Sequence, residues 1–387
     1  MPSPMRGLPW ICLMFLAVLA SCLWSTRSTS LSLAPGGSIA GVIPVAVLGD
    51  SDSHSYHDRI TFPSGGLKRG GAYRETTLQW TEVLARLRGQ RLDPGDWGVH
   101  GTRGMVARAR RWLGREGRSP PKEDFRYNFA LSGSECSDLL EGYAQQARAL
   151  ASLMDQEPEY WRNGVVVIRI GVNSFGDAAE LEQMAHDPMA AQAQRKIASC
   201  VQDIRRSVEM LHARHPRVRI VLVGIFDNSN WVPYLDRWRN PAMLANIGQG
   251  LDVFDHALRD MARADPRIAF FDDRAWFAKR WGARDARGGP AYHELVVGGL
   301  HVRNTAGDAP RNAVLADGHA GTAWNAEWAR SLVELLNSRF NLGIAPITEA
   351  EVAAVVGTGQ QGQARGKVGS KAPAVQKLDR PVASVNR

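Results

Sequence analysis

The stretch VIPVAVLGDSDSHSYHD, residues 42–58, passes directly from an apolar run into a cluster of acids, hydroxyls and two histidines. The apolar part is continuous rather than alternating, which is typical of a strand covered on both faces. We therefore expect the polar part to lie at the carboxyl end of a buried strand. It could be a metal-binding loop, a plain turn or the position of a nucleophile, and the remaining sequence distinguishes these interpretations.

Four further apolar runs have the same character, and helical stretches fall between them. The runs are YNFALSG (127–133), GVVVIRIG (164–171), VRIVLVGIF (218–226) and RIAFFDD (267–273). The expected helices cover Glu75 to Arg88, Ser137 to Met154, Ala190 to Arg214, Ala242 to Ala264 and Gly321 to Arg339. Alternating strands and helices predict an α/β fold, a three-layer α/β/α sandwich around a parallel sheet. In such folds the ligand crevice lies beyond the carboxyl ends of the strands.

Length and composition exclude some classes of function. With 387 residues and 44% apolar composition, the chain can bury a large core in one large or two modest domains. The net charge of +8 comes from scattered Lys and Arg, with no basic stripe interleaved with aromatic residues, which argues against a nucleic-acid partner. The 12 Trp residues favour a sugar-like or apolar ligand, although most Trp side chains fill cores.

The N-terminus predicts export to the periplasm or cell surface. Residues 1–24 combine Arg6, an apolar run from Leu8 to Ala20, and small residues suited to signal peptidase. The sequence Leu-Ala-Ser-Cys ending at Cys22 resembles the bacterial lipobox, which would make Cys22 a lipidated residue and its lipid the one contact with a membrane. An ordinary signal peptide or an uncleaved anchor fits the same residues.

The rest of the chain divides into a linker, a domain and a tail. Residues 25–40 are small and polar and predict a flexible linker, residues 41–345 the folded domain, and residues 346–387 a disordered basic tail without aromatic residues. Cys136 and Cys200 remain after export, either as one disulfide or as two buried thiols.

Small and polar residues recur where the predicted strands end. Ser51 follows the first strand, Gly133 the second and Asn173 the third. A serine on a tight turn after a strand can present its hydroxyl in the crevice, and backbone N–H groups with an amide can surround an oxyanion. The hydroxyl needs a base, and the sequence offers His319 with Asp317, just before the last amphipathic helix.

These residues resemble the motifs of the SGNH hydrolases, also called the GDSL esterase/lipase group, over residues 41–345. The first block matches Gly49-Asp50-Ser51, the second Gly133, the third Gly171 to Asn173, and the last His319. Three positions depart from the pattern: Asp52 stands where Leu is common, Ser174 replaces an Asp, and Ala316 stands three residues before the histidine where the family has Asp. Asp317 lies only two residues before His319.

The resemblance implies a flavodoxin-like five-stranded parallel sheet in the order 2-1-3-4-5, and neither a metal nor an organic cofactor. It also implies Ser51 as nucleophile, His319 as base, and an oxyanion hole made by the Ser51 N–H, the Gly133 N–H and the Asn173 amide. Asp317 could orient the His319 ring through a shifted turn, or a backbone carbonyl could do so instead.

The polar cluster has a rival interpretation, in which Asp50, Asp52, His54, His57 and Asp58 ligate a metal. No metal-binding spacing of His or Cys pairs and no calcium-loop pattern supports it. We expect Asp52, His54 and His57 to lie at the rim of the crevice and to contact substrate. We also expect Trp231, beyond the fourth strand, to stack on a sugar ring.

The sequence thus predicts an exported serine esterase that hydrolyses short acyl esters, acetyl above all, on a small molecule or a polysaccharide. An O-acyltransferase with the same site, acting on polysaccharide, and a non-catalytic glycan-binding surface protein of the same fold are the alternatives. Acyl chain length and oligomeric state stay open.

Overall fold

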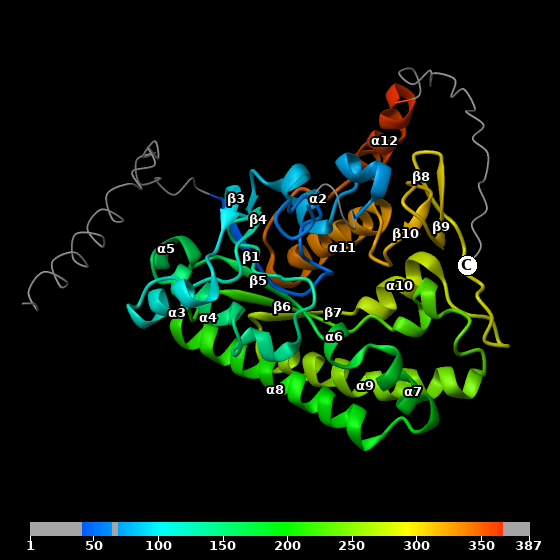
Figure 1. Cartoon of the computed structure of the whole chain (residues 1–387), viewed down its shortest axis with the longest axis horizontal. Coiled ribbons are helices and arrows are strands. Elements are labelled where there is room, and N and C mark those ends of the chain that lie inside the picture. Colours follow the sequence, from blue (N-terminus) through cyan, green and yellow to red (C-terminus); the bar gives the residue numbers. More distant parts are fainter. Residues whose placement is uncertain (1–40, 64–68, 367–387) are drawn as a thin grey trace, which may run out of the picture. The chain divides into compact units, whose positions relative to one another are not determined.

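The computed structural model describes residues 41–63 and 69–366 (Figure 1). The predicted signal peptide, Cys22 and the 25–40 linker lie outside these residues. Among the helices of the described ranges, none is long and apolar enough to cross a membrane.

A five-stranded parallel sheet forms the centre of the described domain. Its order is β2-β1-β5-β6-β7, which confirms the predicted order 2-1-3-4-5. The strands are β1 (Ile43–Gly49), β2 (Leu92–Asp93), β5 (Val165–Arg169), β6 (Arg219–Val223) and β7 (Ile268–Phe271).

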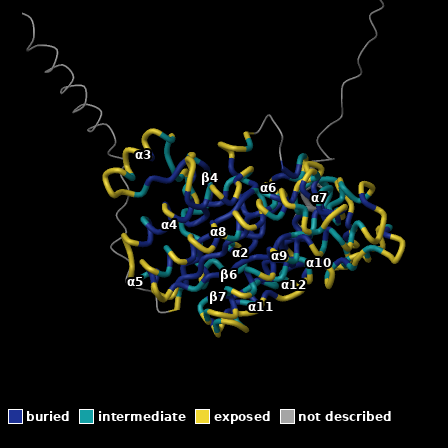
Figure 2. Tube along the Cα trace, turned by 90° about the horizontal axis from the view of Figure 1, so that it is seen from below, coloured by how far each residue is buried: buried dark blue, intermediate teal, exposed yellow. Residues whose placement is uncertain are grey.

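Both faces of this sheet are covered, which explains the continuous apolar runs. In β1, Ala46 and Leu48 pack into one apolar cluster, whereas Val45 and Val47 pack into another on the opposite face. Figure 1 shows helices on both sides of the sheet, and Figure 2 shows the buried interior. The three-layer α/β/α sandwich is therefore confirmed. One layer contains α4 (Gln146–Met154), α5 (Pro158–Trp161), α7 (Ala178–His186), α8 (Ala191–Arg214) and α9 (Pro241–Ala264), and the other α2 (Trp80–Arg88), α10 (Asp273–Trp281), α11 (Thr322–Phe340) and α12 (Glu349–Gly366).

The second strand differs from the prediction. Residues 127–133 do not form a regular strand, although they run beside β1: Val47 N donates to Tyr127 O (3.0 Å) and Phe129 N donates to Val47 O (2.8 Å). The first half of this sheet edge is occupied instead by β2. Two short segments therefore share one edge, and neither is long enough to produce a clear signal by itself.

An insertion separates those two edge segments. It consists of the antiparallel pair β3 (Trp97–His100) and β4 (Lys122–Phe125), with α3 (Gly104–Trp112) between them. A second addition, β8 (Leu295–Val297), β9 (Leu300–Ala306) and β10 (Asn312–Val314), forms a small sheet before α11. Both are absent from the sequence-based prediction.

The predicted helices ending at Arg214, Ala264 and Arg339 are confirmed to within two residues at each end. The two earlier ones begin later than predicted, because 3₁₀ turns η1 (Gly71–Thr76) and η2 (Cys136–Leu139) precede α2 and α4.

The predicted disordered tail is wrong in its first part. Residues Glu349–Gly366 form α12, and its Val352, Val355 and Val356 side chains are buried with Ile347. The absence of aromatic residues from this segment suggested that it could not pack, but these small apolar side chains suffice to dock a helix. Residues 367–387 lie outside the described ranges.

The question of Cys136 and Cys200 is resolved by the structure, in which they form a disulfide. The bond links η2 to α8 across a sequence separation of 64 residues.

Candidate active site

A cavity of about 340 Å³ opens beyond the carboxyl ends of the central strands. Segments far apart in the sequence meet there, as expected for the crevice of such a sheet. Of the predicted site residues, those that line this cavity are Ser51, Asp52, Asn173, Trp231, Asp317 and His319. Gly133, His54 and His57 are not among the residues that line it.

Ser51 lies on the turn that ends β1. The turn is closed by Ser53 N and His54 N, which both donate to Asp50 O (3.2 and 3.1 Å). A Cβ atom at Gly49 would overlap the carbonyl oxygen of Arg169 on the neighbouring strand, so only glycine allows this close approach. The local structure thus holds the Ser51 backbone firmly at the strand end.

Two buried polar groups support this turn. The Gln146 side chain accepts from Gly49 N and donates to Gly49 O, both at 2.8 Å. Burial, with a smaller contribution from the charge of Asp52, raises the pKa of Asp50 to about 8. Burial therefore favours the protonated form of the Asp50 carboxyl.

His319 lies in the loop that leads into α11. Leu315 N donates to His319 O at 2.7 Å, and the Trp231 indole N–H donates to Gly318 O at 2.6 Å. Gly318 has a φ of +91°, and a Cβ there would overlap the Trp231 ring. The contact between Gly318 and Trp231 therefore fixes the loop against the cavity wall. Any larger residue at position 318 would have to displace the Trp231 ring.

Asp317 contacts the His319 ring obliquely. Its Oδ1 lies 3.1 Å from His319 Nδ1, but Nδ1 has no well-aligned hydrogen-bond acceptor. The same oxygen accepts the backbone N–H of His319 at 3.1 Å, because the two residues are only two positions apart. Burial raises the pKa of Asp317, but its contacts with His319 and the charge of Arg69 outweigh burial and hold that pKa below its ordinary value.

Arg69 is a site residue that sequence reasoning missed. Its Nη2 lies 2.9 Å from His319 Nε2 and donates to Ser132 Oγ at 3.2 Å, while its Nε lies 3.4 Å from Asp317 Oδ2. A guanidinium only donates, so His319 Nε2 must be the acceptor and the ring proton must be on Nδ1. Within the described residues, no hydrogen bond joins Ser51 Oγ to His319 Nε2.

No local pattern identifies Arg69. It lies in a Gly-rich loop rather than at a strand end, and its role depends on residues 250 positions away in the sequence. Only the tertiary structure brings the guanidinium to the ring.

The other two predicted oxyanion donors, Asn173 and Gly133, differ in their position relative to the cavity. Asn173, in α6 (Val172–Phe175), lines the cavity and its Nδ2 donates to Ser134 O at 2.9 Å. An amide nitrogen carries two hydrogens, so one remains for a ligand. Gly133 adopts a φ of +83° beside this segment but lies outside the cavity lining.

The expectation that His54 contacts substrate at the rim disagrees with the structure. His54 is fully buried, with Nε2 2.8 Å from Asp58 Oδ2 and Nδ1 3.1 Å from both the backbone N and the Oγ of Ser132. Burial lowers its pKa to about 4. A neutral His54 then donates from Nε2 to Asp58 and accepts at Nδ1, and the same serine hydroxyl accepts from Arg69.

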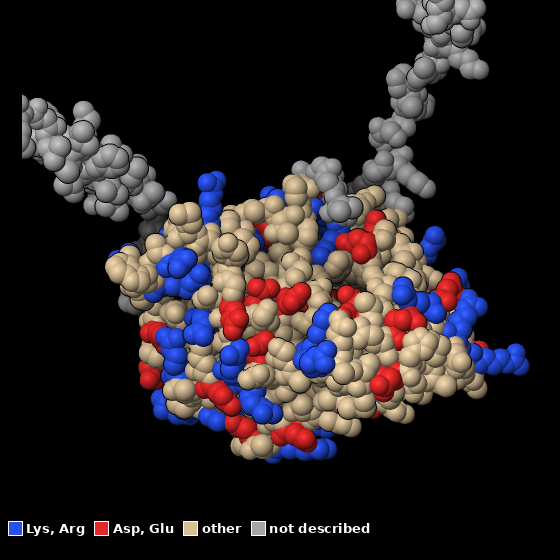
Figure 3. All heavy atoms as spheres, turned by 60° about the horizontal axis from the view of Figure 1, so that its bottom comes forward, with Lys and Arg blue, Asp and Glu red and all other residues tan. Residues whose placement is uncertain are grey.

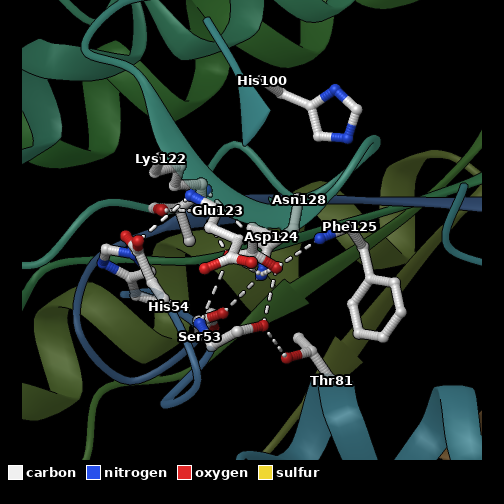
Figure 4. A network of polar contacts seen from close by, with 12 residues as sticks. Ser53, His54, Thr81, His100, Lys122, Glu123, Asp124, Phe125 and Asn128 are labelled. Carbon is white, nitrogen blue, oxygen red and sulfur yellow. Dashed lines mark hydrogen bonds and ion pairs between the residues drawn. The ribbon is translucent and has the colours of Figure 1, made fainter. Parts of the chain in front are cut away.

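A second buried cluster anchors the 53–58 loop to β4 (Figure 4). The Asp124 carboxylate accepts from Lys122 Nζ (2.7 Å), Ser55 Oγ (2.6 Å) and Asn128 Nδ2 (3.1 Å). Burial lowers the pKa of Lys122 to about 8. These contacts pair the buried Lys122 ammonium with the buried Asp124 carboxylate, as a dry interior requires.

The acids and histidines of residues 50–58 are directed at different partners. His57 Nδ1 lies 2.7 Å from Glu82 Oε1, His54 faces Asp58, and Asp50 caps its own turn. No group of three or more His, Cys, Asp or Glu side chains in the described ranges is arranged to hold a metal ion.

The cavity wall combines aromatic rings with one paired cation. Phe226, Trp231, Tyr234 and Trp324 form its apolar side. Arg169 also lines it, but its Nη2 lies 3.1 Å from the buried Asp273 Oδ2, so its charge is compensated.

Comparison with known proteins identifies a family. A model of the GDSL-like Lipase/Acylhydrolase family matches residues 47–302. No curated protein matches the chain.

Among solved structures, similar ones include three bacterial or metagenomic enzymes. An extracellular lipase from Streptomyces rimosus is 15% identical, with 77% of this chain and 100% of that chain covered and a TM-score of 0.39. The lipase Lip_vut3 from a goat rumen metagenome is 13% identical, with 76% and 97% covered and a TM-score of 0.36. Phospholipase A1 from Streptomyces albidoflavus NA297 is 14% identical, with 77% and 99% covered and a TM-score of 0.35.

Proposed function

The chain belongs to the GDSL-like lipase/acylhydrolase family and is an ester hydrolase, and on this premise we propose that Ser51 is its nucleophile and His319 its general base. The observation that carries the proposal is that Ser51 and His319, from opposite ends of the domain sequence, line one cavity together with Asn173. A hydroxyl, an imidazole and an amide donor are the groups that acyl transfer through a serine requires.

The proposed first step forms an acyl-enzyme. Ser51 Oγ attacks the ester carbonyl carbon while its proton passes to His319 Nε2. The carbonyl oxygen becomes an oxyanion held by the Ser51 N–H and the Asn173 amide. The Gly133 N–H joins them once the segment that carries Gly133 moves slightly toward the cavity. His319 then returns the proton to the leaving alcohol as the carbon–oxygen bond breaks.

The second step is hydrolysis of that intermediate. Water gives a proton to His319 Nε2 and its oxygen attacks the acyl carbon, which releases the carboxylic acid and restores Ser51. In both steps the Nε2 lone pair that accepts from Arg69 must accept from Ser51 or water instead. Arg69 can yield this contact because Asp317 and Ser132 remain as acceptors.

The proposed substrate is a short acyl ester, acetyl above all, on a carbohydrate. A cavity of about 340 Å³ suits a small acyl group with part of one sugar ring rather than a long chain. Trp231 and Tyr234 supply aromatic faces of the kind on which sugar rings pack. Asp52 at the cavity adds an acceptor for a sugar hydroxyl.

Turnover of p-nitrophenyl acetate, butyrate and octanoate tests the proposal. We expect kcat/KM to be highest for the acetate and to fall to background in Ser51→Ala. Trp231→Ala should raise KM more for an O-acetylated glycan than for p-nitrophenyl acetate, whose turnover also falls because the hydrogen bond to Gly318 O beside His319 is lost. Full turnover in Ser51→Ala would refute the nucleophile.

The same assay separates the alternative functions. Acetyl transfer to an added sugar in excess of acetate release would identify an O-acyltransferase. Glycan binding without turnover would identify a binding protein. Either result would replace the esterase proposal while leaving the fold unchanged.

A further inference from the structure

Exposed apolar side chains concentrate in one insertion of the domain. Of the 11 large hydrophobic residues exposed in the described ranges, six fall between residues 97 and 113. Four of these six lie on or next to α3: Met105 (88% exposed), Trp112 (85%), Leu113 (61%) and Val106 (47%). Figure 2 shows α3 as a largely exposed segment at one end of the domain.

The spacing of these residues makes a continuous apolar face on α3. At about 100° per residue, Met105, Ala109, Trp112, Leu113 and Val106 project within one sector of roughly 120°. Ala107, which projects away from that sector, is the one buried residue of the helix. The apolar face therefore points away from the domain, the reverse of an ordinary surface helix.

Arginines border this face on both sides. Arg108 flanks one edge of the sector, and Arg110 with Arg103 flanks the other. Residues 103–115 contain five Arg and no acid. Arg103, Arg108, Arg110 and Arg115 have no acidic partner among the described residues. Figure 3 shows that basic and acidic side chains are intermixed over much of the face it presents.

We propose that α3 docks on the surface of an anionic phospholipid bilayer. Met105, Trp112 and Leu113 would enter the boundary between headgroups and acyl chains, and the flanking arginines would reach lipid phosphates. A Trp with bordering Arg is the combination that membrane interfaces favour. The opposite sign of lipid phosphate matches the unpaired arginines, whereas a second copy of this face would bring like charges together.

This docking does not depend on the proposed catalytic residues. α3 contributes no residue to the cavity, and Figures 1 and 2 both show it at the end of the domain far from α10. Substitutions on α3 should therefore leave turnover of a small soluble ester unchanged.

Hydroxyl-radical footprinting of the full chain tests the proposal within one molecule. The probe is vesicles of equal phosphatidylglycerol and phosphatidylcholine. Oxidation of Met105 and Trp112 should fall several-fold with these vesicles and recover at high salt. Met189, 61% exposed on another part of the surface, is the internal control and should not change.

Paired variants test the role of the charges. The double variant Arg108→Ala with Arg110→Ala should weaken binding of the protein to these vesicles roughly thirty-fold. Arg217→Ala with Arg263→Ala, exposed arginines on other elements, should leave the Met105 footprint as in the wild type.

Three outcomes would overturn the proposal. The first is unchanged oxidation of Met105 whether or not the chain sediments with vesicles. The second is equal protection by pure phosphatidylcholine. The third is protection without vesicles that grows with protein concentration or appears with an acidic polysaccharide, which would assign the face to self-association or to glycan.

Discussion

The contact of Arg69 with His319 links two histidines that lie in different environments. His319 faces the cavity, whereas His54 is buried beneath it, and Arg69 and Ser132 connect them through hydrogen bonds of 2.9 to 3.2 Å. Sequence motifs could identify His319, since it precedes a helix at the expected end of the domain. They misassigned His54, because a histidine in a polar loop resembles a rim residue until its burial is known.

The oblique contact of Asp317 predicts a modest catalytic role. A well-aligned orienting carboxylate is worth about 10⁴-fold in turnover. Here the ring N–H is poorly aligned, so we expect Asp317→Asn to lower kcat by only about 10- to 100-fold, much less than His319→Ala. Steady-state kinetics on p-nitrophenyl acetate measures this.

The matched control is Asp308→Asn, since Asp308 accepts from Ala316 N in the same loop but lies outside the cavity. Equal losses in the two Asp variants would assign the effect to loop structure, and a loss near that of His319→Ala would contradict the modest role.

His54 predicts a dependence of stability on pH. Burial lowers its pKa from 6.5 to about 4, so between these values the unfolded chain binds more protons than the folded one. Stability therefore falls as pH falls through this window. His54 should lower the free energy of unfolding by roughly 2 kcal/mol when the pH falls from about 7 to about 5.

Denaturant unfolding of the wild type and His54→Gln at both pH values checks it. The variant should be less stable at neutral pH but should lose less on acidification. An identical pH dependence in both proteins would refute the assignment of a neutral buried His54.

At the scale of elements, strands were predictable where both faces are covered. The runs at β1, β5, β6 and β7 are continuously apolar because alternate residues enter two different clusters. The edge beside β1 was not predictable in the same way, since β2 is two residues long and residues 127–131 pair irregularly. The β3–α3–β4 insertion separates the two segments of that edge in the sequence.

Helix α12 predicts that the chain end contributes to stability. Ile347, Val352, Val355 and Val356 are buried, and Arg88 holds Glu351 through two contacts of 2.8 and 2.9 Å. Deleting residues 346–387 should cost roughly 6 kcal/mol of unfolding free energy, at about 1.5 kcal/mol for each apolar side chain.

Deletion of residues 367–387 alone is the control and should leave the melting temperature unchanged. Thermal unfolding followed by circular dichroism measures both. Equal melting temperatures of the two truncated chains would contradict the packing of α12.

At the scale of the whole molecule, the convergence of Ser51 and Asn173 followed from topology, whereas His319 was identified by the family resemblance. Parallel strands end at one edge of a sheet, so residues after successive strands meet there whatever their distance in the sequence. Arg69 and the burial of His54 could not be foreseen in this way, because loop conformation and packing determine them.

The central claim is that Ser51 is the residue activated by His319. Labelling with a p-nitrophenyl alkylphosphonate, followed by peptide mass mapping, tests it most directly. We predict one adduct per chain, on Ser51, formed far more slowly in His319→Ala and absent in Ser51→Ala. An adduct on Ser132, beside His54, or ester turnover that persists without any adduct on Ser51, would contradict it.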